Sequence, residues 1–156
     1  MNFKNQTFWV VAFLGLILDQ VTKFVVKQTF ELEQSLPLWK GVFHLTYVTN
    51  KGAAFSLFAG QGEWLRWLSL WVSLGLIALV VFSPNLRKIE QLGYGFILAG
   101  ALGNGIDRFL AGAVVDFLDF RLIQFPIFNV ADICINIGIF FLLLVNFVKP
   151  AHENKR

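Results

Sequence analysis

Apolar residues along this chain gather into long segments separated by shorter polar ones. Four segments approach the ~20 residues that a helix needs to cross the hydrocarbon core of a bilayer. By residue number they are about 8–26, 64–82, 92–111 and 127–148. We therefore predict an all-α membrane protein with four transmembrane helices, forming a single domain over residues 1–156.

The polar segment between the first two spans has a pattern of its own. Residues 42–49 are rich in β-branched and aromatic side chains, which is typical of a strand. Asn50-Lys51-Gly52-Ala53-Ala54-Phe55 follows, where Asn50 and Gly52 suit a turn. We predict a small extracytoplasmic β-element at the membrane surface; the alternative is an ordered surface loop without function. Residues 112–126, between the last two spans, are expected to form a loop.

Composition supports a membrane location. Hydrophobic residues make up 56% of the chain and the mean hydropathy is +0.65, which excludes an ordinary soluble domain. The single cysteine, Cys134, excludes an intramolecular disulfide and a CxxC metal site. No histidine lies near Asp116 or Asp132 in the sequence, so we expect no metal. The first span is too long for the apolar core of a signal peptide and is expected to be a retained helix.

The placement of Lys and Arg predicts an orientation. Basic residues are concentrated before span one, between spans two and three, and after span four: Lys4, Arg87, Lys88, Lys149, Lys155 and Arg156. Short basic segments stay in the cytoplasm. Both termini are therefore predicted to be cytoplasmic, and residues 28–63 and 112–126 extracytoplasmic.

Polar residues inside the first and third spans share helix faces. Asp19 and Lys23 are four residues apart with the acid first, the favourable order for a pair. They form either a structural ion pair or a direct contact with a substrate. Asn104, Asp107 and Arg108 share one face at the end of the third span, which is rich in glycine and alanine and suited to close packing in lipid.

The fourth span begins with a further set of polar residues. Asn129, Asp132 and Asn136 have the spacing of one helix face, and polar groups there must point into the bundle. Cys134 points elsewhere and is expected to be a packing residue.

Two carboxylates carry the functional argument. Asp116 lies in Val114-Val115-Asp116-Phe117, and Asp132 ends Phe128-Asn129-Val130-Ala131-Asp132, sixteen residues later. An ionisable residue at membrane depth marks a functional site by default. When two carboxylates share a site, one keeps a proton while the other acts as a base, as in aspartic proteases. A small transporter or proton channel and a structural protein with polar helix contacts remain as alternatives.

Five motifs together resemble lipoprotein signal peptidases, the signal peptidase II family. They are Asp19-Gln20-x-Thr22-Lys23, Asn50-Lys51-Gly52-Ala53-Ala54-Phe55, Gly100-Ala101-Leu102-Gly103-Asn104-x-x-Asp107-Arg108, Val114-Val115-Asp116-Phe117 and Phe128-Asn129-x-Ala131-Asp132. Many members have Ser after the second aspartate, where this chain has Ile133. Ile133 is off the polar face, so the departure does not count against activity.

The resemblance implies an aspartyl endopeptidase of the bacterial inner membrane. It would remove signal peptides from prolipoproteins, cutting before a diacylglyceryl-modified cysteine, with its site at the outer leaflet. Asp116 and Asp132 would be catalytic. The supporting residues would be Asn50, Asn104, Arg108, Asn129, Asp19, Lys23, Asn136 and Asp107. We expect a monomer in contact with membrane lipids, with no cofactor, no metal and no nucleic-acid partner.

Overall fold

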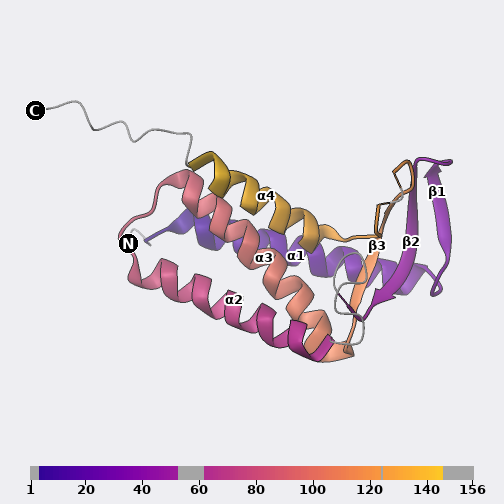
Figure 1. Cartoon of the computed structure of the whole chain (residues 1–156), viewed down its shortest axis with the longest axis horizontal. Helices are drawn as coiled ribbons and strands as arrows, with labels where there is room; N and C mark the ends of the chain where they lie inside the picture. The colour runs from indigo at the N-terminus through magenta and orange to yellow at the C-terminus, as the bar shows by residue number, and fades with distance from the viewer. Residues whose placement is uncertain (1–3, 53–61, 124, 146–156) are drawn as a thin grey trace, which may run out of the picture.

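The computed structural model describes residues 4–52, 62–123 and 125–145, and is mostly helical with a small antiparallel sheet at one end (Figure 1). In chain order the elements are α1 Gln6–Thr29, β1 Ser35–Trp39, β2 Phe43–Asn50, α2 Gly62–Phe82, α3 Lys88–Ala111, β3 Val114–Phe120 and α4 Val130–Val145. The helices lie side by side along the long axis, and α1 begins and α4 ends at the end away from the sheet (Figure 1).

Helix α3 is the central helix of the bundle and contacts each of the other three. Small residues make this possible, as the sequence predicts. A Cβ added to Gly103 would collide with the carboxylate of Asp19, and one added to Gly15 would lie 2.8 Å from Cβ of Ala99. Close helix approach therefore depends on these glycines, and it brings α1 near enough for its polar residues to reach α3.

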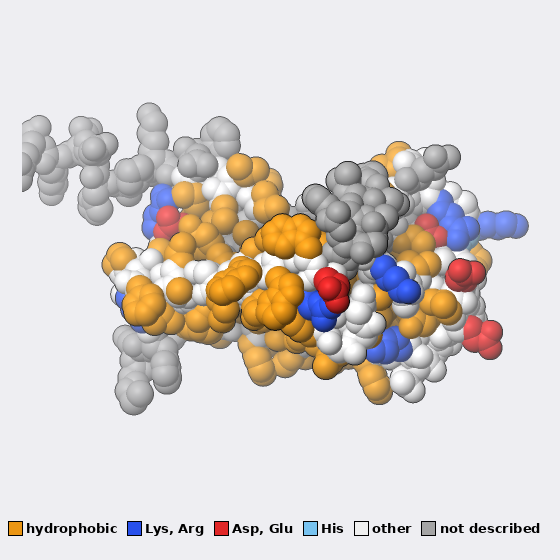
Figure 2. Space-filling model, turned by 60° about the horizontal axis from the view of Figure 1, so that its bottom comes forward, with side chains coloured by type: hydrophobic (Ala, Val, Ile, Leu, Met, Phe, Trp, Pro, Cys, Tyr) orange, Lys and Arg blue, Asp and Glu red, His pale blue; other side chains and the backbone are white. Residues whose placement is uncertain are grey.

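The helical surface is largely apolar. Among the described residues, two helices are long and apolar enough to cross a membrane, Gln6–Thr29 and Glu63–Phe82. Helix α4 is apolar but shorter over its described residues, Val130–Val145. Figure 2 shows hydrophobic side chains covering the helical part of one face, with many of the charged side chains near the end that carries the sheet. Such a surface suits contact with lipid and not with water.

The three-stranded sheet has the order β1-β2-β3 and both pairings are antiparallel. The strand expected at residues 42–49 is confirmed as β2. The expectation of a loop at residues 112–126 is wrong in part, because Val114–Phe120 forms β3. This strand pairs Val114 with Asn50 and Asp116 with Val48. The β-element is thus built from both connections, between α1 and α2 and between α3 and α4.

Two features fix the sheet against the bundle. Helix α3 ends at Ala111, and Gly112 caps it: with a positive φ of 70°, Gly112 bonds the carbonyl of Arg108 through its N–H before the chain enters β3. A buried cluster of Val26, Val115 and Phe117 then joins the end of α1 to the sheet. The strand that carries Asp116 is therefore held by packing on one helix and by a short connection to another.

Candidate active site

Asp116 is a buried carboxylate whose two oxygens are both bonded by neutral amides. Asn50 Nδ2 donates to Oδ2 at 2.9 Å and Asn129 Nδ2 donates to Oδ1 at 2.7 Å. The side chain is only 2% exposed. Burial raises the pKa of Asp116 to about 6; the amide hydrogen bonds lower this pKa, and the nearby charge of Asp132 raises it. Asp116 can therefore exchange a proton near neutral pH.

Asp132 is held by the start of α4. Asn129 precedes the helix, and its Oδ1 accepts the N–H of Asp132 at 3.0 Å. In return, Oδ2 of Asp132 accepts the backbone N–H of Asn129 at 3.1 Å. This reciprocal pair is a capping box. The expectation that Asn129 shares a helix face with Asp132 and Asn136 is corrected. Asn129 lies before the helix as its cap, whereas Asp132 lies in the first turn.

Asn129 is the residue that links the two carboxylates. The same side chain donates to Asp116 and caps the helix that carries Asp132. Asn104 on α3 completes the link, because its Nδ2 donates to Oδ1 of Asp132 at 2.8 Å and its Oδ1 accepts from Asn129 at 3.0 Å. Among the described residues, neither Asp116 nor Asp132 forms an ion pair, although the charge of the half-buried Arg108 acts on both.

A buried ion cluster lies behind this pair. The ammonium of Lys23 is 2.9 Å from carboxylate oxygens of both Asp19 and Asp107, and it donates to Asn104 Oδ1 at 2.9 Å. Asp19 accepts the N–H of Ala131 in the first turn of α4 at 2.9 Å. Asp107 accepts the N–H of Val115, next to Asp116, at 3.2 Å. The cluster thus fixes the backbone beside each catalytic candidate.

Gln20 belongs to the same cluster, although the sequence analysis gave it no role. Its amide nitrogen, Nε2, donates to Oδ2 of Asp19 at 3.1 Å and to the carbonyl of Gly103 at 3.2 Å. Its place next to Asp19 in the first motif was the available signal. Asp19 and Lys23 form the ion pair that their spacing suggested; both are buried and neither lines the pocket.

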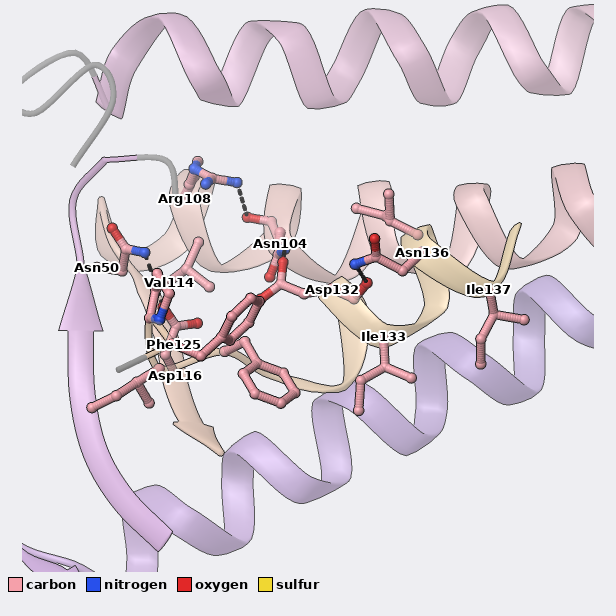
Figure 3. Close-up of a pocket in the computed structure, with 14 residues that line it drawn as sticks. Asn50, Asn104, Arg108, Val114, Asp116, Phe125, Asp132, Ile133, Asn136 and Ile137 are labelled. Atoms are coloured by element: carbon pink, nitrogen blue, oxygen red, sulfur yellow. Dashed lines mark hydrogen bonds between the residues drawn. The ribbon is translucent and has the colours of Figure 1, made fainter. Parts of the chain in front are cut away.

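A pocket of about 420 Å³ opens in front of the two carboxylates (Figure 3). Polar side chains from β2, β3, α3 and α4 reach into it: Asn50, Asn104, Arg108, Asp116, Asp132 and Asn136. The opposite wall is apolar, with Phe125, Pro126, Ile127 and Ile133 among its residues. This wall could not be predicted from the sequence, since the segment before α4 has no periodic pattern. Ile133 adds to the apolar lining.

Arg108 and Asn136 lie at the margin of the site. Arg108 donates to the carbonyl of Gly52 at 3.3 Å and to that of Asn104 at 3.4 Å. Asn136 donates to the backbone carbonyl of Asp132 at 2.9 Å. Ala53–Phe55 of the second motif lie outside the described residues. Cys134 is buried and does not line the pocket. Among the described residues, no three His, Cys, Asp or Glu side chains are grouped to hold a metal.

A model of the family described as signal peptidase (SPase) II matches residues 11–148. The chain belongs to the signal peptidase II family. A lipoprotein signal peptidase of Nostoc punctiforme is 65% identical over 156 residues, covering 100% of this chain and 99% of the relative. That of Gloeothece citriformis is also 65% identical, over 99% of this chain and 98% of the relative. The chain is accordingly a peptidase, and the transporter and structural alternatives are set aside.

Solved structures agree with this membership. A bacterial membrane enzyme determined by the in meso method at 2.3 Å resolution superimposes with a TM-score of 0.87 and 28% identity, covering 100% of this chain and 98% of that one. A second, at 1.9 Å resolution, gives a TM-score of 0.81 and 29% identity over 92% and 94% of the two chains. The helical bundle with its small sheet is therefore the fold of a membrane enzyme.

Proposed function

We propose that Asp116 and Asp132 are the catalytic pair with which this signal peptidase removes signal peptides from prolipoproteins. The observation that carries the proposal is the side chain of Asn129, which bonds Asp116 and caps the helix turn that holds Asp132. Two carboxylates joined in this way line one pocket, and no described Lys or Arg forms an ion pair with either, so they can share a proton.

The reaction needs one carboxylate and one carboxylic acid. The carboxylate takes a proton from a water molecule, and the water oxygen attacks the carbonyl carbon of the residue before the lipid-modified cysteine. The carboxylic acid donates a hydrogen bond to the carbonyl oxygen as negative charge develops there. A proton then passes to the cysteine nitrogen, the C–N bond breaks, and a signal peptide with a new carboxylate leaves. The amides of Asn104 and Asn129 keep the two acids in place throughout.

The apolar wall suits the substrate class. A diacylglyceryl group carries two acyl chains that remain in lipid, and the pocket exposes Phe125, Ile127 and Ile133 beside the polar groups. We propose that the lipidated cysteine lies against this wall and that cleavage occurs on the N-terminal side of that cysteine. Apolar residues then contact the modified side chain while the carboxylates face the peptide bond.

We further propose four membrane spans, about 8–26, 64–82, 92–111 and 127–148, with both termini in the cytoplasm of a bacterial inner membrane. Support comes from the antiparallel run of the four helices and from the basic segments in the sequence. The site then faces the outer leaflet. Reporter fusions after Lys88 and Lys149 should be cytoplasmic and those after Gln61 and Gln124 external; a cytoplasmic reporter at Gln61 contradicts this arrangement.

The deciding experiment is cleavage of a purified prolipoprotein by the purified protein in detergent or nanodiscs. A diacylglyceryl-modified substrate should be cut, and the same substrate without the lipid should be cut far more slowly. Equal rates for the two substrates would remove the role proposed for the lipid. Retained cleavage by Asp116→Asn or Asp132→Asn would overturn the catalytic pair.

A further inference from the structure

The far end of the sheet presents an apolar surface that the proposed reaction does not use. Trp39 ends β1, and Leu122 and Ile123 follow β3; their exposed fractions are 68%, 64% and 67%. Lys40 lies next to Trp39 and is also exposed. We call these four residues the sheet tip. Exposed apolar clusters of this kind mark contact sites for membranes or proteins.

Hydrogen bonds hold the two halves of the sheet tip together. Arg121 N–H donates to the carbonyl of Val42 at 2.9 Å, and Val42 N–H donates to the carbonyl of Trp39 at 2.9 Å. Figure 1 shows the turn between β1 and β2 beside the end of β3, on the side of the molecule where α4 lies. The tip is therefore one ordered surface built from two connections.

The charge of the sheet tip is positive. Arg121 is paired with Asp119 at 2.7 Å, which leaves little net charge there. Among the described residues, Lys40 forms no ion pair. An aromatic side chain, two aliphatic side chains and an unpaired ammonium are the combination found at the interface of a bilayer with anionic lipids.

The lipid-facing surface of α1 runs toward the sheet. Large apolar side chains of α1 are exposed as far as Phe24 and Val25, close to its end at Thr29. Leu32 in the following turn and Leu36 and Leu38 on the edge strand β1 are exposed as well. Apolar exposure thus continues from a membrane-facing helix into the strand that leads to the sheet tip. This continuity, together with the charge, favours the membrane over a protein as the covering partner.

We propose that the sheet tip binds the headgroup region of the bilayer, with Trp39, Leu122 and Ile123 inserted among lipids and Lys40 on anionic phospholipid headgroups. The consequence for the enzyme follows from the chain path. Phe125–Phe128 lines the pocket and comes soon after Ile123. A tip held in the leaflet keeps this wall at lipid level, where the acyl chains of a lipidated substrate lie.

Site-directed spin labelling in nanodiscs tests the proposal, which rests on the membrane-spanning arrangement proposed above. In a Cys134→Ala background that still cleaves substrate, single cysteines replace Leu122 and Ile123 in turn. Phe13→Cys in α1 serves as the lipid reference and Asn85→Cys, an exposed position between α2 and α3, as the aqueous reference. We expect the tip labels to collide several-fold less with a water-soluble nickel complex than the Asn85 label does, and more with oxygen.

The outcomes distinguish lipid binding by the sheet tip from the membrane-spanning arrangement. Both faces of a nanodisc are open to the reagents, so a label is shielded from nickel only by lipid or protein. Tip labels as accessible to nickel as the Asn85 label overturn the tip proposal alone, provided that the Phe13 label is in lipid. A Phe13 label open to nickel overturns the spanning arrangement as well. Tip labels shielded from both reagents indicate a second copy of the protein on the tip, and also overturn lipid binding.

The charge is tested separately with Lys40→Glu. Attraction to an anionic surface amounts to about fivefold in equilibrium constant per Lys, so the substitution should shift the tip label toward water by about fivefold or more in anionic nanodiscs. It should have no such effect in zwitterionic nanodiscs. Lys40→Arg is the matched control and should behave as the parent. An equal effect of Lys40→Glu in both lipids would overturn the role given to Lys40.

Discussion

Strand β3 carries two buried aspartates three residues apart, and their surroundings differ in kind. Asp116 accepts hydrogen bonds from two neutral amides, those of Asn50 and Asn129. Asp119 accepts from the Thr46 hydroxyl at 2.6 Å and from Nε of Arg121 at 2.7 Å. Within the part of the chain that the structure describes, no cation contacts the carboxylate of Asp116, whereas Arg121 lies at contact distance from that of Asp119.

This difference explains why one strand can serve both catalysis and structure. A cation in contact stabilises the ionised carboxylate and keeps it charged. Amide donors bond the carboxylate oxygens but do not offset the full free-energy cost of burying a negative charge. Burial therefore raises the pKa of Asp116 to about 6. Asp119 instead links the three strands, because Thr46 and Arg121 both also bond Ser35 of β1. Asp116, which lacks such a cation, is poised to gain and lose a proton.

The largest expected effect is loss of cleavage in Asp116→Asn and in Asp132→Asn. Asparagine keeps the size of the side chain but cannot act as a base or share a titrating proton. The double variant should be scarcely slower than either single one, since the two residues act as a unit. The measurement is the rate of signal-peptide release from lipidated prolipoprotein.

Asp119→Asn is the matched control on the same strand and should retain cleavage in protein that has folded. Cys134→Ala should also leave the rate nearly unchanged. If Asp119→Asn were as inactive as Asp116→Asn while both stayed folded, the distinction between the two aspartates would fail.

The next effect separates the two roles of Asn129. Asn129→Ala removes both the helix cap and the donor to Asp116, whereas Asn129→Ser keeps a residue that caps helices well. We expect both variants to lose ~10²–10³ in turnover, the usual consequence of removing a donor at a reacting centre. Only the Ala variant should also lose about 1 kcal/mol of stability from the missing cap. Normal turnover in Asn129→Ser would reduce this residue to a cap.

A smaller effect concerns pH. Burial raises the pKa of Asp116 to about 6, so Asp116 loses its proton as pH rises through this value. Because the proposed reaction needs one protonated acid, kcat/KM should fall about tenfold per pH unit above that point. Asn50 donates to the ionised form of Asp116 and thereby lowers its pKa. Asn50→Ala should raise this pKa and move the falling limb to higher pH.

Asn136→Ala is the control for that shift, because Asn136 bonds the backbone carbonyl of Asp132 and not a carboxylate. In Asn136→Ala, the fall of kcat/KM with pH should begin at the same pH as in the parent protein. If the fall of kcat/KM began at lower pH in Asn50→Ala, Asn50 would stabilise the protonated acid instead.

The sequence alone allowed the long helices, the strand at 43–50 and the candidate carboxylates to be predicted, since each has a local signal. Helix α2 ends at Phe82 as expected, where Ser83 and Pro84 follow. Strand β3 was missed because its two aspartates interrupt the apolar pattern. One donor to each aspartate comes from β2 and is in place only after β3 pairs with β2: Asn50 for Asp116 and Thr46 for Asp119. That pairing includes a bulge between Leu45 and Val48.

The role of Asn129 shows a second reason for a partial prediction. Its spacing from Asp132 fits both a shared helix face and a capping box, and helix periodicity alone favours the first. The choice depends on where α4 begins, and helix ends are weakly encoded. The link between Ser35, Thr46 and Asp119 was likewise out of reach, because it joins three strands whose pairing no local pattern specifies.

The smallest expected effect tests the structural aspartate without touching its charge. Thr46→Val removes the hydroxyl that bonds Asp119 and Ser35 but keeps the β-branched shape that suits a strand. We expect a loss of about 1 kcal/mol in stability, the usual worth of one buried hydrogen bond, and no change in cleavage rate. Thr49→Val on the same strand is the control, because Thr49 is exposed, and its stability should not change. Thermal unfolding in detergent and the cleavage assay are run on both variants. A Thr46→Val protein that kept its stability but lost cleavage would place the polar link around Asp119 in the catalytic machinery, and the contrast between the two aspartates of β3 would have to be abandoned.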